Sequence, residues 1–222
     1  MIRFENVTKR YVIDGREKTV VENMNVVVPT GRSVGLLGRN GAGKSTLLRM
    51  ISGATEPTRG RIRTKGLVSW PVGFAGSFHP DLTGLQNCSF IARIYGVDTE
   101  ELAQFVEEFA GLGMHFRLPL RSYSSGMRSR LAFGVSMGIS FDIYLVDEIT
   151  AVGDVAFRES SDRLFKARLR NAGAVVCSHA MGQIRLLCDS GLVLEDGQAY
   201  YYEDLEEGIA HHEDNMRRAA AV

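Results

Sequence analysis

Residues 38–45 read Gly-Arg-Asn-Gly-Ala-Gly-Lys-Ser, and this spacing of glycines before a lysine and a hydroxyl predicts a phosphate-binding loop. Gly38, Gly41 and Gly43 allow the backbone to wrap around a phosphate with its N–H groups pointing inward. The first turn of the helix that should follow adds positive potential. Lys44 is therefore expected to reach the β- and γ-phosphates of a nucleoside triphosphate.

Four further residues of this segment are assigned to the same ligand. Asn40 and Ala42 belong to the loop around the phosphates, and Thr46 supports the phosphates at the start of the helix. The Ser45 hydroxyl should be a ligand of Mg²⁺. GTPases, kinases and other nucleotide-driven machines share such loops, so the loop by itself predicts only that a nucleoside triphosphate binds. The chain has no Asn-Lys-x-Asp sequence to read guanine, which argues against a GTPase.

A pair of carboxylates ends the mostly apolar run that begins at Phe141. Such a run predicts a buried strand, whose end at the carboxyl edge of a sheet would place Asp147 and Glu148 beside the phosphate loop. Asp147 is expected to hold Mg²⁺, directly or through water. Glu148 is expected to polarise the attacking water as a general base. Taken alone, the pair could also be the acidic end of a surface strand.

A second anion site is indicated where Tyr123-Ser124-Ser125-Gly126-Met127 opens a helix with small residues. By itself this stretch could be an ordinary Ser/Gly helix cap. It resembles, however, the Leu-Ser-Gly-Gly-Gln signature of the ABC ATPases, and it lies in their order between the phosphate loop and the acidic strand end. In that family Ser124, Ser125 and Gly126 would bind the γ-phosphate of ATP held by the partner subunit.

Three more features resemble this family in the same order. His179 follows an apolar strand and resembles the histidine that contacts the γ-phosphate, with a catalytic role beside Glu148. Tyr11 resembles the aromatic residue on which adenine stacks. The sequence Ala151-Val152-Gly153-Asp154 resembles the loop that crosses the dimer interface. The resemblance implies a head-to-tail homodimer that holds two ATP molecules, with Mg²⁺, between its subunits.

The branch of the family is indicated by residues 69–84, 123–133 and 146–154, which together resemble the ATPases of capsular and O-antigen polysaccharide exporters. The first of these segments lacks the glutamine usual in ABC ATPases. The chain leaves no room for the extra carbohydrate-binding domain of many O-antigen exporters, so the short capsular kind is favoured. That kind implies an integral membrane permease, periplasmic and outer-membrane export components, and a peripheral position at the cytoplasmic face of the bacterial inner membrane.

Other functions remain open at this point. The ATPase of an O-antigen or teichoic-acid exporter is hard to distinguish by sequence from that of a capsular polysaccharide exporter. A soluble ABC ATPase acting on ribosomes or DNA would usually show two cassettes or long coiled-coil insertions, and a phosphate-loop kinase would not need residues 123–127.

The elements expected to position these residues form an α/β fold. We predict a P-loop NTPase (RecA-like) core with an N-terminal antiparallel β subdomain and an inserted α-helical subdomain. Asp14-Gly15 predicts a hairpin, Val26–Val28 a third strand, and residues 60–68 one more strand. Apolar residues at helical spacing run from 82 to 113. The predicted parts are 1–84 and 136–205 for the core, 85–135 for the helical subdomain, and 206–222 for a helical, charged tail.

Composition supports a cytosolic protein that acts through partners. The 222 residues are 45% apolar and carry 26 basic and 26 acidic side chains, so no nucleic-acid partner is expected. The three cysteines, Cys88, Cys177 and Cys188, show no paired spacing and read as small buried residues. No apolar run reaches the about 18 residues of a membrane span, so any action at a membrane should go through a partner.

Overall fold

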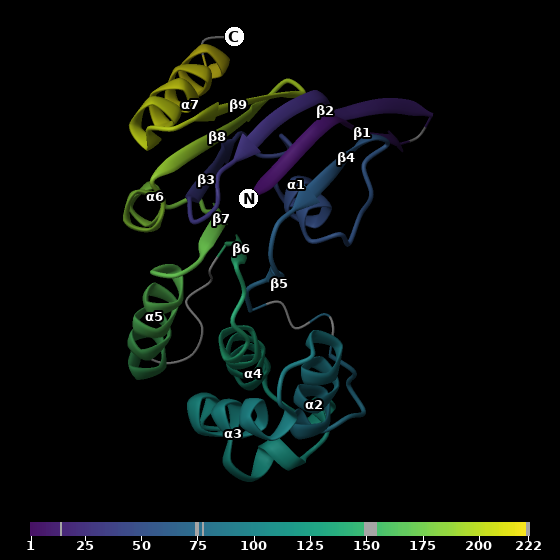
Figure 1. Ribbon diagram of the computed structural model, residues 1–222, viewed down its shortest axis with the longest axis vertical. Coiled ribbons are helices and arrows are strands. Elements are labelled where there is room, and N and C mark those ends of the chain that lie inside the picture. The colour runs from purple at the N-terminus through teal and green to yellow at the C-terminus, as the bar shows by residue number, and fades with distance from the viewer. Residues whose placement is uncertain (14, 74–75, 77, 149–154, 221–222) are drawn as a thin grey trace. The chain divides into compact units, whose positions relative to one another are not determined.

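The computed structural model describes residues 1–13, 15–73, 76, 78–148 and 155–220 (Figure 1). It divides into two compact units, which are described separately. The first contains residues 1–71, 141–148 and 171–222. The second contains the described residues of 72–140 and 149–170. The chain thus leaves the first unit after residue 71 and returns to it twice.

An antiparallel sheet of order β2-β1-β4 forms one layer of the first unit. Its strands are β1 (Ile2–Ile13), β2 (Arg16–Val28) and β4 (Arg59–Thr64). The hairpin predicted at Asp14-Gly15 is confirmed, because Ile13 pairs with Arg16. The separate strand predicted at Val26–Val28 is wrong: these residues continue β2, whose pairing with β1 persists through register shifts.

The second layer is a six-stranded sheet of order β5-β6-β7-β3-β8-β9. Its strands are β3 (Ser33–Gly38), β5 (Val68–Pro71), β6 (Ile143–Asp147), β7 (Gly173–Cys177), β8 (Ser190–Glu195) and β9 (Gln198–Tyr202). All neighbours are parallel except the hairpin β8–β9. The central strands are buried almost throughout, as a parallel sheet requires.

The single strand predicted over residues 60–68 is two strands in two different sheets. β4 ends at Thr64, and Val68 begins β5. Between them Gly66 has φ +96°, and the Leu67 N–H donates to the Asp142 carboxylate at 2.6 Å. The turn at this glycine is what moves the chain from one sheet to the other.

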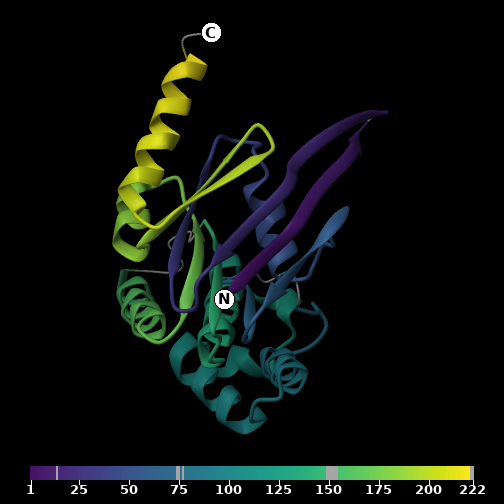
Figure 2. The same cartoon turned by 45° about the horizontal axis from the view of Figure 1, so that its top comes forward.

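The described residues of the first unit form three helices: α1 (Lys44–Ile51), α6 (Met181–Leu187) and α7 (Leu205–Ala220). The buried residues of α1, Leu47 and Leu48 among them, join one core with the apolar faces of both sheets. α7 confirms the helical tail and packs against β3, β8 and β9. The β1–β2 hairpin and α7 are both visible along their length in Figure 2.

The second unit is helical. It contains α2 (Gly84–Tyr95), α3 (Thr99–Ala110), α4 (Ser125–Gly138) and α5 (Val155–Leu169), with short 3₁₀ turns at Gly113–Arg117 and Leu120–Ser122. The helical period of residues 82–113 is confirmed by α2 and α3. Thr83 caps α2 with a reciprocal bond to Gln86. Phe109 stacks with Phe133 and contacts Phe157 in a tilted arrangement, which joins α3, α4 and α5.

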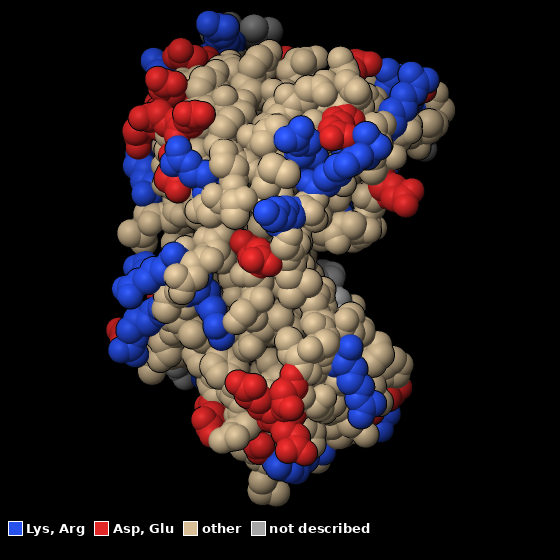
Figure 3. Space-filling model, in the orientation of Figure 1, with Lys and Arg blue, Asp and Glu red and all other residues tan. Residues whose placement is uncertain are grey.

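Charged side chains of both signs occur on the face shown in Figure 3. In the first unit, for example, Glu5 of β1 pairs with Arg61 and Arg63 of β4. A search of the described residues found no helix with both the length and the apolar character that crossing a membrane requires.

Candidate nucleotide-binding site

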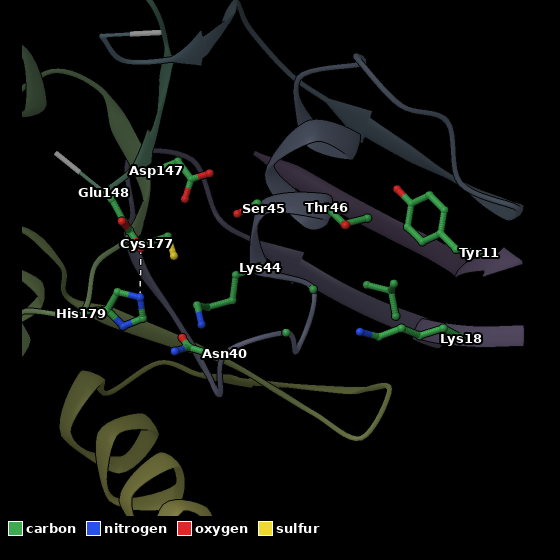
Figure 4. Close-up of a pocket in the computed structure, with 13 residues that line it drawn as sticks. Tyr11, Lys18, Asn40, Lys44, Ser45, Thr46, Asp147, Glu148, Cys177 and His179 are labelled. Carbon is green, nitrogen blue, oxygen red and sulfur yellow. Dashed lines mark ion pairs between the residues drawn. The ribbon is translucent and has the colours of Figure 1, made fainter. Parts of the chain in front are cut away.

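A pocket of about 370 Å³ lies within the first unit, and the residues of the phosphate loop and of the acidic strand end line it (Figure 4). Its size is in the range of small-ligand sites. The described lining residues are Tyr11, Lys18, Val20, Asn40, Gly41, Gly43, Lys44, Ser45, Thr46, Asp147, Glu148, Cys177 and His179.

The phosphate loop joins β3 directly to α1, because β3 ends at Gly38 and α1 begins at Lys44. Gly43 has φ +104°, and a Cβ atom there would overlap the Cγ1 atom of Val20, so only glycine fits. The Lys44 ammonium donates to the carbonyl oxygens of Gly38 and Arg39 at 2.6 and 3.0 Å. The lysine is thus held at the loop, at the N-terminal end of α1.

The two carboxylates come from the end of β6, beside the end of β7. Asp147 pairs with Cys177 across these parallel strands, and the Glu148 N–H donates to the Cys177 carbonyl at 2.9 Å. Glu148 has φ +48°, an uncommon conformation for a residue with a side chain. Its Oε1 atom lies 2.9 Å from His179 Nε2 (Figure 4). The backbone turn therefore brings the carboxylate within hydrogen-bond reach of the histidine.

The loop after β7 that carries His179 is fixed by its own hydrogen bonds. The Ala180 N–H donates to the Ser178 hydroxyl at 3.1 Å, and that hydroxyl donates to the Gln183 side chain at 2.8 Å. These bonds hold the turn into α6. His179 is accordingly presented from a short, ordered turn at the carboxyl edge of the sheet.

Cys177 is a pocket residue whose thiol stays protonated at neutral pH. Burial, followed by the charge of Asp147, raises its pKa to about 11. A thiol with that pKa is a poor nucleophile, because the thiolate is the reactive form. Cys177 therefore contributes a small neutral surface beside the acids.

The far end of the pocket is built by the β1–β2 hairpin. Tyr11 lies there, and the Lys9 ammonium stands 4.8 Å from the centre of its ring. Lys18 and Val20 also line the pocket and were missed by sequence reasoning. The hairpin turn contained the signal: a register that pairs Ile13 with Arg16 also pairs Tyr11 with Lys18.

Ser45 and Asp147 face this same pocket with a hydroxyl and a carboxylate. Oxygen donors of this kind are the ligands that Mg²⁺ prefers. The donor set therefore fits the metal assigned to these two residues.

Gly38 and Ala42 belong to the same loop, although they are outside the described lining of the pocket. The Ala42 N–H donates to the Arg39 carbonyl at 3.1 Å, so Ala42 shapes the loop from within. The dimer-interface loop at Ala151–Asp154 falls outside the described residues.

The signature residues lie in the second unit, at the N-terminus of α4. Ser124 is the N-cap, and its hydroxyl accepts from the Met127 N–H at 3.2 Å. Ser124, Ser125 and Gly126 are all exposed. The Arg128 guanidinium donates to the Tyr123 carbonyl at 3.1 and 3.2 Å, which ties the preceding residue to the helix. The structure thus presents these residues as an exposed helix start.

Comparison with known proteins places the chain in a family. The sequence profile of the ABC transporter family matches residues 21–151. The polysialic acid transport ATP-binding protein KpsT of Escherichia coli is 47% identical over 212 residues, which cover 94% of this chain and 95% of that protein. The capsule polysaccharide export ATP-binding protein CtrD of Neisseria meningitidis is 42% identical, over 96% of this chain and 98% of that protein.

Solved structures agree on the fold. A dimeric ATP-binding cassette, in a post-hydrolysis state with ADP and Pi, superposes with a TM-score of 0.76 at 23% identity, over 92% of this chain and 99% of that one. With the profile match covering more than half of the chain and the relatives covering nearly all of it, the protein is a member of the ABC transporter family of transport-coupled ATPases, in the branch of the capsular polysaccharide export ATP-binding proteins.

Proposed function

We propose that the chain is the ATP-hydrolysing subunit of an exporter that moves a lipid-linked capsular polysaccharide outward across the bacterial inner membrane. It would work as a homodimer at the cytoplasmic face, beneath an integral membrane permease, with periplasmic and outer-membrane components continuing the path. One observation carries the ATP-hydrolysing part of the proposal: a single pocket gathers Tyr11, Lys44, Asp147, Glu148 and His179 from segments far apart in the chain.

The pocket assigns each of these residues a part in the reaction. Lys44 would exchange its two carbonyl partners for β- and γ-phosphate oxygens, since charge-assisted bonds to phosphate are the stronger ones. Glu148 would accept a proton from the attacking water. His179, which already contacts Glu148 Oε1, would orient that carboxylate and the γ-phosphate. Catalysis would then consist of positioning and electrostatic stabilisation.

Mg²⁺ would be held by Ser45 and Asp147, and when bound it neutralises charge on the β- and γ-phosphates. The chain's own part is to present a hydroxyl from the start of α1 and a carboxylate from the end of β6. Removal of divalent cations with EDTA should therefore abolish hydrolysis, and Mg²⁺ should restore it.

The second half of each site would come from the partner protomer. The exposed start of α4 offers backbone N–H groups and the hydroxyls of Ser124 and Ser125. A helix start of this kind suits a γ-phosphate held by another subunit. A monomer would have two incomplete sites and should hydrolyse ATP slowly.

The cargo proposal rests on sequence similarity. Two proteins named for polysialic acid transport and capsule polysaccharide export align with nearly the whole chain, at 47% and 42% identity. Co-purification with a permease, and loss of surface polysaccharide when Lys44→Ala replaces the wild-type gene, would test it. Normal export with Lys44→Ala would contradict the proposal.

The composite site is tested with Glu148→Gln, which should keep ATP bound because it removes the general base. Size-exclusion chromatography with light scattering should show an ATP-dependent dimer, and adding Ser124→Arg should abolish it. Ser122→Arg, at an exposed serine of the preceding turn, is the matched control and should leave the dimer intact. A dimer that survives Ser124→Arg would contradict the composite site.

A further inference from the structure

Lys18 is a cation of the pocket that the sequence motifs do not mark. It lies in β2 and pairs directly with Tyr11 of β1, so both side chains stand on the same face of the hairpin. Both line the pocket (Figure 4). Lys18 therefore places a positive charge next to the Tyr11 ring, on which adenine is expected to stack.

The Lys18 side chain reaches the phosphate loop. An ideal Cβ atom on Gly41 would lie 3.9 Å from Lys18 Nζ. Val20, two residues further along the same face of β2, packs against Gly43. Figure 4 shows the lysine directed toward the loop that carries Lys44. The hairpin thus contacts the phosphate loop through Val20 and places the ammonium of Lys18 beside the same loop.

The order of groups along the pocket decides which part of a nucleotide this cation meets. With adenine on Tyr11 and the β- and γ-phosphates at Lys44, the ribose and the α-phosphate must cross the space between Tyr11 and Gly41. The ammonium of Lys18 lies in that space. A charged phosphate oxygen is a stronger partner for an ammonium than a ribose hydroxyl.

We infer that Lys18 binds the α-phosphate of the nucleotide, an inference that rests on the proposed ATPase function. The contact is the same for ATP and for ADP, whereas Lys44 also meets the γ-phosphate, which only ATP has. Lys18 therefore contributes to holding the nucleotide before and after hydrolysis. It does not contribute to selecting ATP over ADP.

Displacement of a fluorescent ATP analogue by ATP, ADP, AMP and adenosine tests this assignment on the full chain. Lys18→Met should raise the Kd for ATP, for ADP and for AMP by the same factor, about five- to tenfold, as expected for one charge-assisted contact at an exposed site. Lys18→Arg should retain most of the affinity. Displacement by adenosine, which has no phosphate, should be unchanged.

Arg16→Met is the matched control, because Arg16 lies two residues earlier on the same strand and outside the described lining of the pocket. It should leave each Kd unchanged, and thermal unfolding midpoints should show that all variants are folded. An unchanged Kd for ADP in Lys18→Met would overturn the inference. A loss of affinity confined to ATP would assign the ammonium to the γ-phosphate, and a loss for ATP and ADP but not for AMP would assign it to the β-phosphate. An equal loss for adenosine would assign it to the ribose. Each of these results would also overturn the inference. Wild-type protein that binds neither ATP nor ADP would refute the proposed function itself.

Discussion

The contact between Gly43 and Val20 holds the phosphate loop against the β1–β2 hairpin, and it can be tested by Gly43→Ala. The new Cβ atom would overlap Val20 Cγ1, and alanine would have to adopt φ +104°. Backbone strain of this kind costs about 1–3 kcal/mol. Inserting one carbon atom into a packed contact costs about 1–3 kcal/mol more. Together these effects should destabilise the first unit by about 4 kcal/mol.

A second substitution separates the two effects. Val20 is 6% exposed, and Val20→Ala removes the atom that would be overlapped, at a cost of about 2 kcal/mol for the lost packing. The double variant keeps the backbone strain but loses the overlap. Its destabilisation should therefore be smaller than the sum of the single effects by about 2 kcal/mol.

Urea unfolding followed by Trp70 fluorescence measures these differences. Trp70 is the only tryptophan of the chain and lies in β5, so it reports on the first unit. ATP affinity, measured in parallel, should fall for Gly43→Ala, because the displaced loop no longer directs its N–H groups inward. Single effects that add to within about 0.5 kcal/mol in the double variant would refute the steric reasoning.

Three further predictions concern the pocket and the cysteines. Glu148→Gln should lower the ATPase rate by about a hundredfold or more with little change in the Kd for ATP, since only the general base is lost; a normal rate would contradict that role. Tyr11→Ala should raise the Kd for ATP by about tenfold and Tyr11→Phe should not, because the ring stacks and the hydroxyl is not required; equal effects of both would argue against stacking. Alkylation by iodoacetamide, followed by mass spectrometry at pH 8, should be slow at all three cysteines of the folded protein. Burial raises the pKa of Cys88 and of Cys188 to about 12, and that of Cys177 to about 11. The thiolate fraction of Cys177 at pH 8 should therefore be about 100-fold below that of a free thiol. The contribution of its neutral thiol to the free energy of unfolding should be lost as the pH rises from about 9 to about 11. Urea should restore rapid labelling at all three; rapid labelling without urea would contradict the burial.

Much of the site could be predicted from the sequence because its chemistry depends on local spacing. The phosphate loop needs glycines, a lysine and a hydroxyl within eight neighbouring residues. Asp147 ends one strand of the parallel sheet and His179 follows another, and the carboxyl ends of such strands meet at one edge. The pocket does bring these groups together. Their catalytic roles stay predictions until the variants above are measured.

What the tertiary structure alone decided is which segments from different parts of the chain touch. The turn at Gly66 transfers the chain between two sheets, and a single glycine within a strand-like stretch does not by itself predict such a transfer. Cys177 meets Asp147 only through the register of β6 and β7. Lys18 and Val20 reach the loop only because the hairpin packs against Gly43. The register of the parallel strands and the packing of the hairpin against the loop depend on contacts between distant segments, and no local spacing encodes them.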